Sequence, residues 1–202
     1  TLYETFQKGE CDILIGTQMI IKGIDFRHVG LVGVLDADAG LHVPDFRSQE
    51  RSFQMLFQVM GRCGRRGQDS EVVIQTSLPD HPLFSFIKNR DKIGFYEEEL
   101  SQRKDFFLPP FSRIFKLQFS HKDQKKAFAM ARKAEEIFQE GIGRLFSQEQ
   151  ISLSVAPALV PKMLGRYRIN LLLTAKNPEK ILRSVSPPDR YILDTDPLDV
   201  LG

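Results

Sequence analysis

The sequence predicts two units, an α/β segment followed by a small α+β domain with the βαββαβ order of ferredoxin-like folds. Apolar runs of strand length alternate with longer stretches whose apolar residues recur at helical spacing. The charge is also uneven, since residues 1–106 carry a net charge of −3 and residues 107–202 a net charge of +5. We therefore place the boundary at 106/107, just before two consecutive prolines that prevent a helix from continuing.

The composition is that of a globular protein. Of the 202 residues, 42% are hydrophobic and 27% are charged, which excludes a disordered or fibrous chain. No apolar run approaches the roughly 18 residues needed to cross a bilayer, and the first residues lack a signal-peptide pattern. The two cysteines, Cys11 and Cys63, are too few for a disulfide framework and lack zinc-binding spacing. These features predict a reduced, cytoplasmic protein.

The first residues predict a helix that ends early. Leu2 and Phe6 lie one helical turn apart, and Gly9 follows as a C-terminal cap. The sequence does not begin with methionine. We interpret it as a fragment of a longer protein.

The rest of the first unit alternates strands and helices. Its apolar runs are rich in branched residues and lack alternation, which is typical of a buried parallel sheet. The predicted elements are strands at 12–15 and 29–35, a helix at 46–66, a strand at 71–76, and helices between 84 and 104. With the opening helix, this α-β-β-α-β-α order is that of part of an α/β domain.

The helix at 46–66 has two different faces. Its apolar face consists of Phe53, Leu56, Phe57 and Met60, which recur at helical spacing. Its opposite face carries Gln58, Arg62 and Arg65. Gly61 and Gly64 lie beside the arginines, although glycine inside a helix costs about 1 kcal/mol relative to alanine. Close approach of a ligand or another domain would explain them; the alternative is a solvated basic helix end.

A second group of residues follows the predicted strand at 12–15. The segment GTQMIIKGIDF at 16–26 places Thr17, Lys22, Gly23 and Asp25 after the strand, at the sheet edge where α/β proteins bind ligands. Gly23 permits close backbone approach, and Asp25 can accept hydrogen bonds or orient an arginine. The alternative is an ordinary glycine-bearing connection with routine caps.

These motifs resemble those of a known family. The segment at 16–26 is similar to motif V of superfamily 2 helicases, and QVMGRCGR at 58–65 is similar to their motif VI, Q-x-x-G-R-x-G-R. The segment LDADAGLHVPDFRSQER at 35–51 resembles the bacterial primosomal replication-restart helicases, the PriA family or primosomal proteins N′. The stretches LPPFS at 108–112, GRYR at 165–168 and LDTDPL at 193–198 agree, so the resemblance covers almost the whole chain.

The resemblance implies roles for both motifs. The first unit would be the C-terminal part of a RecA-like helicase lobe 2, with Gln58, Arg62 and Arg65 facing a nucleotide held by the other lobe. Arg65 would be the arginine finger and Arg62 a second phosphate contact, because one guanidinium group can donate two parallel hydrogen bonds to phosphate oxygens. Thr17 would contact a backbone phosphate of single-stranded DNA. The residues placed near the nucleotide would be Lys22, Gly23 and Asp25.

The cofactors implied are ATP and Mg²⁺, bound mainly by the lobe that this sequence lacks. No G-x-x-x-x-G-K-[ST] phosphate loop occurs in the sequence, so we expect no ATP hydrolysis by the chain alone. Asp36 and Asp38 suggest a magnesium site, but the family holds Mg²⁺ on the other lobe, and we interpret both as loop-structuring. His42 and His81 also receive structural roles. The family's zinc would lie outside this sequence, which therefore predicts no metal site.

The second unit begins with alternating apolar and polar residues. The predicted elements are a strand at 113–120, a helix at 123–146, strands at 151–156 and 167–175, a helix at 178–185 capped by Asn177, and a strand at 190–194. The long helix has an apolar stripe of Phe128, Ala131, Ala134, Ile137 and Phe138. This is the βαββαβ order of the ferredoxin-like unit.

The connection at 157–168 carries Lys162, Arg166 and Arg168 around Tyr167. Basic residues beside an aromatic suit phosphates and stacked bases, whereas the alternative is a solvated hairpin whose charges protect a sheet edge. The family resemblance favours DNA. A second basic cluster, of Lys122, Lys125, Lys126, Arg132 and Lys133, is interpreted as a solvated helix face.

The resulting hypothesis is part of an ATP-dependent 3′→5′ DNA helicase. It would recognise stalled or branched replication forks and restart replication by primosome assembly, with forked DNA, single-stranded DNA-binding protein and primosome proteins as partners and no membrane. Two alternatives stay open at this point. One is a non-enzymatic nucleic-acid or protein interaction module, and the other is a different superfamily 2 DNA translocase.

Overall fold

The computed structural model describes residues 2–17, 29–62, 71–185, 187 and 189–200. The chain divides into two compact units, Thr1–Glu97 and Glu98–Gly202. The division lies within α4 (Lys92–Asp105), a few residues before the boundary at 106/107 that we keep as a proposal for the functional domains. No helix in the described ranges is long and apolar enough to cross a membrane.

The first unit contains a parallel pair of strands among helices. Its elements are α1 (Leu2–Gln7), β1 (Leu31–Val34), α2 (Ser48–Arg62), β2 (Glu71–Ile74), α3 (Pro82–Lys88) and the beginning of α4. Leu31 of β1 lies opposite Glu71 of β2, and Val34 lies opposite Ile74. Parallel strands joined through a helix confirm the α/β class of this unit.

The end of α1 follows the sequence prediction. Gly9 has a φ of 72°, in the left-handed region that glycine tolerates best. The amide of Gly9 donates to the carbonyl of Phe6, and the amide of Glu10 donates to that of Thr5, both at 3.1 Å. These two bonds form a Schellman motif, so the predicted glycine cap is confirmed.

The apolar face of α2 lies in the core of the first unit. Phe53 and Leu56 are buried, and Phe57 and Met60 pack partly buried beside them. The ring of Phe53 stacks on Phe95 of α4 with 3.8 Å between centroids. The core is completed by Ala37, Leu83 and Ile87. The predicted apolar face is therefore confirmed, and α2 begins at Ser48, two residues later than predicted.

The predicted strand at 12–15 is wrong. These residues are irregular in the structure, and Ile13 and Ile15 are 77% and 86% exposed. The run has strand-forming residues, but a strand exists only where a neighbour supplies its hydrogen bonds. Within the described ranges β1 and β2 pair with each other and not with this segment.

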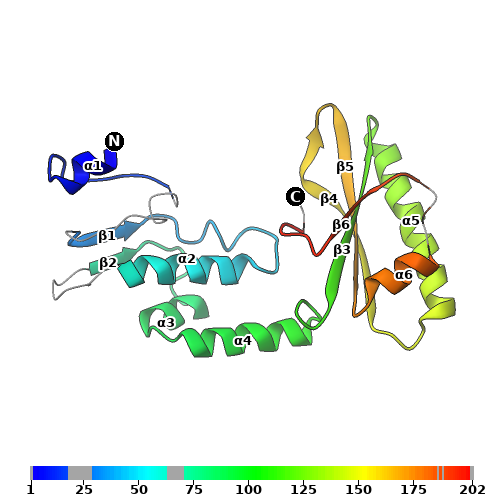
Figure 1. Cartoon of the computed structure of the whole chain (residues 1–202), viewed down its shortest axis with the longest axis horizontal. Coiled ribbons are helices and arrows are strands. Elements are labelled where there is room, and N and C mark those ends of the chain that lie inside the picture. The colour runs from blue at the N-terminus through cyan, green and yellow to red at the C-terminus, as the bar shows by residue number, and fades with distance from the viewer. Residues whose placement is uncertain (1, 18–28, 63–70, 186, 188, 201–202) are drawn as a thin grey trace. The chain divides into compact units, whose positions relative to one another are not determined.

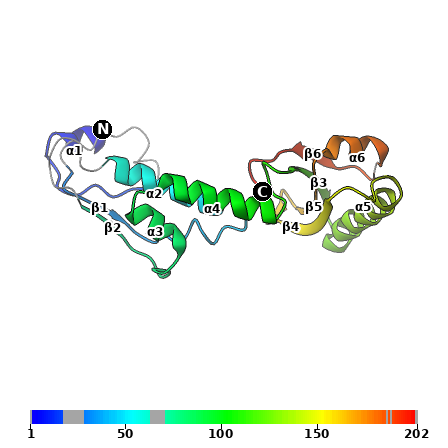
Figure 2. The ribbon, with the colours of Figure 1, turned by 90° about the horizontal axis from the view of Figure 1, so that it is seen from below.

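The second unit is a four-stranded sheet with two helices. Its elements after α4 are β3 (Arg113–His121), α5 (Gln124–Leu145), β4 (Ile151–Met163), β5 (Arg166–Ala175), α6 (Pro178–Ser184) and β6 (Ile192–Thr195). The strand order is β4-β5-β3-β6, and every neighbouring pair is antiparallel. This is the order of a ferredoxin-like βαββαβ fold, which confirms the prediction. Figure 1 and Figure 2 both show α5 and α6 on the same side of the sheet.

The core of this unit lies between the sheet and α5. Alternate residues of β3 and β5 point toward the helix and are almost fully buried, as the period of two requires. They are Phe115, Leu117, Phe119, Ile169, Leu171 and Leu173. From α5 they meet Ala127, Ala131, Ala134 and Phe138, whose small members let the helix approach closely. Of the predicted stripe of α5, Ala131, Ala134 and Phe138 are buried, whereas Phe128 and Ile137 pack partly buried against this core.

Local signals set the ends of α5 and α6. Asp123 caps α5, and its carboxylate accepts a bond from the amide of Lys126 at 3.1 Å. Asn177 is the N-cap of α6, as predicted, but its side chain makes no capping bond. The proline at the first position, Pro178, already fixes the backbone there.

The strand β4 extends well beyond its predicted end at 156 and reaches Met163. Its pairing with β5 shifts register between Pro157 and Lys162, which marks a bulge. The predicted connection at 157–168 is therefore mostly strand, and its turn is only two residues long. We call the part of the hairpin at 157–168 the arm.

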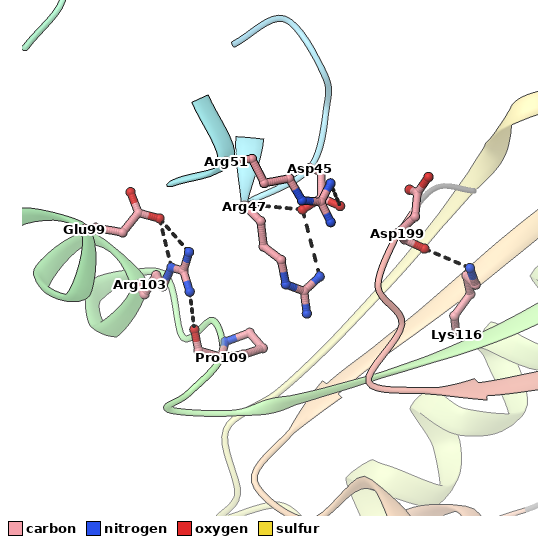
Figure 3. A network of polar contacts seen from close by, with 8 residues as sticks. All are labelled: Asp45, Arg47, Arg51, Glu99, Arg103, Pro109, Lys116 and Asp199. Atoms are coloured by element: carbon pink, nitrogen blue, oxygen red, sulfur yellow. Dashed lines mark hydrogen bonds and ion pairs between the residues drawn. The ribbon is translucent and has the colours of Figure 1, made fainter. Parts of the chain in front are cut away.

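Polar contacts fasten other parts of the second unit (Figure 3). Arg103 donates to the carboxylate of Glu99 at 2.9 Å and to the carbonyl of Pro109 at 3.5 Å. The ammonium of Lys116 donates to the carbonyl of Asp199 at 2.9 Å. It also lies 3.2 Å from the carboxylate of Asp194, which the figure does not draw. The last described residues are thereby held to the middle of β3.

Two glycines of α5 provide a matched test of its packing. A Cβ at Gly141 would lie 2.3 Å from Cγ2 of Val185, whereas a Cβ at Gly143 would meet no atom within 4 Å. We expect Gly141→Ala to lower the free energy of unfolding by about 1–3 kcal/mol through overpacking. Gly143→Ala should raise it by up to about 1 kcal/mol through helix propensity.

Urea unfolding followed by far-ultraviolet circular dichroism would measure both glycine variants. Equal effects of the same sign would contradict the close approach of α5 to Val185.

Candidate functional site

The outer face of α2 presents the first residues of the arginine motif. Gln58 is exposed and lies on the side of the helix opposite the buried Phe53 and Leu56. Arg62 is the last residue of α2, one helical turn beyond Gln58 and on the same side. The side chain of Arg62 and the whole of Arg65 lie outside the described residues. The structure thus places the motif's first half on a continuous, outward-facing stripe.

Gly61 lies in this stripe without a packing reason among the described residues. A Cβ built at Gly61 would meet no atom within 4 Å. Glycine inside a helix costs about 1 kcal/mol relative to alanine, and no close neighbour here offsets that cost.

The residues predicted to lie near the nucleotide are only partly described. Thr17 is exposed in the irregular segment before residue 18. Lys22, Gly23 and Asp25 fall within 18–28, outside the described residues. Of these four residues, Thr17 alone is described.

The carboxyl ends of β1 and β2 are joined by Asp38. Its carboxylate accepts bonds from the amide and the hydroxyl of Ser77, each at 2.6 Å, and from the hydroxyl of Thr76. These donors, the Ser77 hydroxyl foremost, lower the pKa of Asp38 below its ordinary value because they stabilise the carboxylate. The Asp38 side chain is buried, and both its oxygens are engaged within the unit. This agrees with the predicted loop-structuring role.

Two neighbours complete the same loop. Nδ1 of His42 lies 2.8 Å from the carbonyl of Asp38, so this histidine has the structural role predicted for it. Asp36 is exposed, with a φ of 51°. Further along the chain, His81 caps α3 and accepts from the amide of Leu83 at 3.2 Å. Within the described ranges, no three histidine, cysteine or acidic side chains are arranged to hold a metal ion.

A buried acid also anchors the segment that precedes α2. The carboxylate of Asp45 accepts from the amide of Arg47 at 2.8 Å and lies 3.6 Å from the guanidinium of Arg51 (Figure 3). The pair of arginines keeps this buried charge compensated. The segment therefore leads into α2 along a fixed path.

The arm of the second unit carries all three cations predicted to bind DNA. The ammonium of Lys162 lies 4.9 Å from the ring centroid of Tyr167. Arg166 donates to the carbonyl of Ser120 at 2.8 Å, and Arg168 donates twice to the carbonyl of Val160, at 2.7 and 3.2 Å. Lys162 and Arg166 are exposed and Arg168 is half-buried. The three come from adjacent strands at the same end of the sheet.

Sequence reasoning missed two features of the arm. Arg168 donates to the carbonyl of Val160 in the bulge of β4, and no pattern in the sequence predicts this contact. The turn itself is Leu164-Gly165, whose φ values are 49° and 75°. The sequence gives only half of the usual signal for such a turn, because both positions need a positive φ and leucine, unlike Gly165, does not favour it.

The second basic cluster behaves as a solvated helix face. Lys122, Lys125, Lys126, Arg132 and Lys133 are all exposed. Arg132 pairs with Glu135 at 2.6 Å on α5. Exposed lysines of this cluster can therefore serve as control positions when cations of the arm are replaced.

Known proteins are similar to this chain over almost all of its length. Residues 1–67 match the helicase conserved C-terminal domain family. The replication restart protein PriA of Treponema pallidum (strain Nichols) is 38% identical over 210 residues, covering 98% of this chain and 31% of that protein. The PriA protein of Bacillus subtilis (strain 168) is 38% identical over 175 residues, covering 87% and 21%. That of Synechocystis is 34% identical, covering 98% and 24%.

The chain thus spans between about a fifth and a third of the length of these curated relatives. The matched helicase family ends within the first unit, while the similarity to the PriA proteins continues through the second. The combination of both units is what the chain shares with these relatives.

The hydrogen bonds of Asp38 predict acid sensitivity. Because its folded pKa is lowered, the ionised carboxylate stabilises the fold above the unfolded pKa of about 3.9, and this contribution is lost as the pH falls through the folded pKa. Asp38→Asn should therefore be less stable than the parent at neutral pH. The difference should shrink below about pH 4.

Urea midpoints of the parent and Asp38→Asn between neutral and acid pH would measure this effect, with Asp36→Asn as the exposed control. A gap between parent and Asp38→Asn that stays constant over the whole pH range would contradict it.

Proposed function

This chain corresponds to the C-terminal part of the PriA replication restart proteins, and we propose that it supplies one side of an ATP site and a DNA-binding surface to a DNA helicase. The helicase would use ATP with Mg²⁺ to move 3′→5′, recognise stalled or branched forks and restart replication. The observation that carries this proposal is the outward stripe of α2, in which Gln58 and Arg62 open the pattern Q-x-x-G-R-x-G-R on the side opposite the buried Phe53 and Leu56.

The ATP site would be shared between two lobes. Gln58, Arg62 and Arg65 would approach the phosphates from this side, and Lys22, Gly23 and Asp25 would lie near the nucleotide. ATP supplies the phosphoryl group, and arginines stabilise the charge that develops on it. Gly61 supports this proposal, since the open space beside it leaves room for a bound ligand.

The chain by itself is proposed to be inactive in ATP hydrolysis. Its sequence contains no phosphate loop, so the β-phosphate and Mg²⁺ would be held by another part of the helicase. The zinc of the family is likewise proposed for another part, because Cys11 and Cys63 are the only cysteines here.

The DNA contacts are proposed at two places. Thr17, exposed at the end of the first described segment, would contact a phosphate of the single strand. The arm would contact DNA through Lys162, Arg166 and Arg168, with support from their common position on one end of the sheet. Single-stranded DNA-binding protein and primosome proteins are the proposed protein partners, and the cytoplasm is the proposed location.

The finger role of Arg65 gives a direct test. In the full-length protein, Arg65→Ala should lower DNA-stimulated ATP turnover by about 10³–10⁵-fold, the range of arginine fingers in comparable enzymes. DNA binding should change little, because the guanidinium acts on the nucleotide. Steady-state phosphate release and fluorescence anisotropy with labelled DNA would measure the two properties.

Arg66→Ala is the matched control for Arg65, since it removes the same charge one residue beyond the motif. The isolated chain should release no phosphate above background. A loss of less than about tenfold for Arg65→Ala, under roughly 1.4 kcal/mol of barrier, would refute the finger role.

The arm gives a second test, on DNA binding by this chain. Each phosphate contact contributes roughly 0.9 to the slope of log affinity against log salt on duplex DNA. The double variant Lys162→Ala/Arg166→Ala should therefore flatten that slope by about one to two units. Arg168 is left in place because its bonds to Val160 support the bulge.

The control for the arm is Lys125→Ala/Lys133→Ala, which removes two exposed cations from α5. Titrations of labelled duplex DNA with the parent and both variants at several salt concentrations would measure the three salt slopes. If the arm variant kept the parent's slope, its cations would be surface charge without a role in DNA binding.

A further inference from the structure

The arm is a positive structure without any opposing charge of its own. From the start of β4 to the end of β5 the chain contains Lys162, Arg166 and Arg168 and no Asp or Glu, although 27% of the whole chain is charged. Nothing on these two strands neutralises the three cations. The arm therefore favours an anionic partner over a neutral or basic one.

The cations are also held in place behind the tip of the arm. Arg168 is bonded to Val160 across the bulge, Arg166 to Ser120 on β3, and Lys162 lies over the ring of Tyr167. A side chain that is already ordered loses little rotamer freedom on binding. The arm is thus a preorganised surface and not a flexible basic loop.

The tip of the arm is an unusual place for leucine. Leu164 has a φ of 49° and Gly165 a φ of 75°, the combination of a type I′ turn. Asparagine, aspartate and glycine are the residues that tolerate the first of these positions, because a larger side chain crowds the backbone there. Leu164 is in addition 95% exposed. An asparagine would relieve both the backbone strain and the apolar exposure.

Leu164 is not the only exposed apolar side chain on the arm. Met163 beside it is 47% exposed, and Leu159 and Val160 in the bulge are each 51% exposed. Single exposed leucines are ordinary on protein surfaces, but a strained one among further apolar residues indicates a contact. The arm consequently combines an apolar tip with fixed cations directly behind it.

A nucleic acid with accessible bases can contact both the apolar tip of the arm and the cations behind it. At the end of a duplex, where two strands part, an apolar base-pair face lies beside anionic phosphates. Apolar side chains that insert against bases, with cations on the adjacent phosphates, are an established mode of DNA binding. A protein partner would not require the complete absence of acids along the arm.

We propose that Leu164 is an apolar wedge that stacks on the last base pair of a duplex at its junction with single strands. Lys162 and Arg166 hold the phosphates on either side of that base pair. The proposal rests on the DNA-binding function proposed for the arm and adds to it a preference for junctions over uninterrupted duplex.

The test uses the whole chain with Leu164→Asn, which suits a positive φ and should fold at least as well as the parent. The probes are a forked duplex with two single-stranded tails, a tail-less duplex of the same sequence, and the single strand. The parent should prefer the fork, and Leu164→Asn should lose about tenfold in affinity for the fork alone, the scale of burying one leucine side chain. Its salt slope should stay that of the parent, because no cation is removed.

Two controls separate the wedge from other effects. Leu145→Asn removes a leucine that is 60% exposed at the end of α5 and should leave fork binding unchanged. A 2-aminopurine at the junction base pair should change its fluorescence with the parent and not with Leu164→Asn. Thermal unfolding of each variant would verify that the fold is retained.

The outcomes distinguish this proposal from the one on which it rests. If the parent binds none of the probes, the DNA-binding function of the arm fails and the wedge with it. If the parent binds but Leu164→Asn equals it on every probe, only the wedge is refuted. If Leu164→Asn instead changes the sedimentation of the chain and not its DNA binding, the tip is a protein contact and the wedge is likewise refuted.

Discussion

The pairing of β3 with β5 is the constraint on which the second unit depends. The two strands run antiparallel from Arg113 opposite Ala175 to His121 opposite Tyr167, without interruption. This register places Phe115, Leu117 and Phe119 on the same face as the buried residues of β5, where α5 covers them. A slip by one residue would turn every one of these side chains to the other face. The register therefore determines the core, and through β5 it also fixes where the arm begins.

The first unit depends on a comparable arrangement around α2. The inner face of α2 is held by the stack of Phe53 on Phe95, whereas Gln54 and Gln58 are exposed on its outer face. The Asp38 carboxylate joins the ends of β1 and β2 through Ser77 and Thr76. In the first unit the stack fixes α2 from inside, and Gln58 lies on the other side of that helix.

Much of the fold was predictable because its signals are local. The glycine cap of α1 and the apolar stripes of α2 and α5 each involve residues close together in the sequence, so their patterns can be recognised in it. The strand expected at 12–15 failed for the opposite reason, since pairing depends on a neighbour that the run itself cannot specify. The hydrogen bond from Arg168 to the carbonyl of Val160 could not be predicted from the sequence either. It forms only because the bulge in β4 places that carbonyl within reach of Arg168. For the candidate site, the sequence identified Gln58 as outward-facing and the arm as basic, and it missed the strained leucine between the cations.

The topology of the second unit also governs how it can form during synthesis. β3 is a central strand, yet one of its two neighbours, β6, is made last, and the contact between Arg113 and Asp196 joins residues 83 positions apart. While the ribosome is still adding the intervening residues, one edge of β3 has no partner. An open central edge is a template for pairing with other chains, and such long-range contacts also slow folding. Until β6 is in place, the nascent unit therefore exposes the backbone amides and carbonyls along one edge of β3.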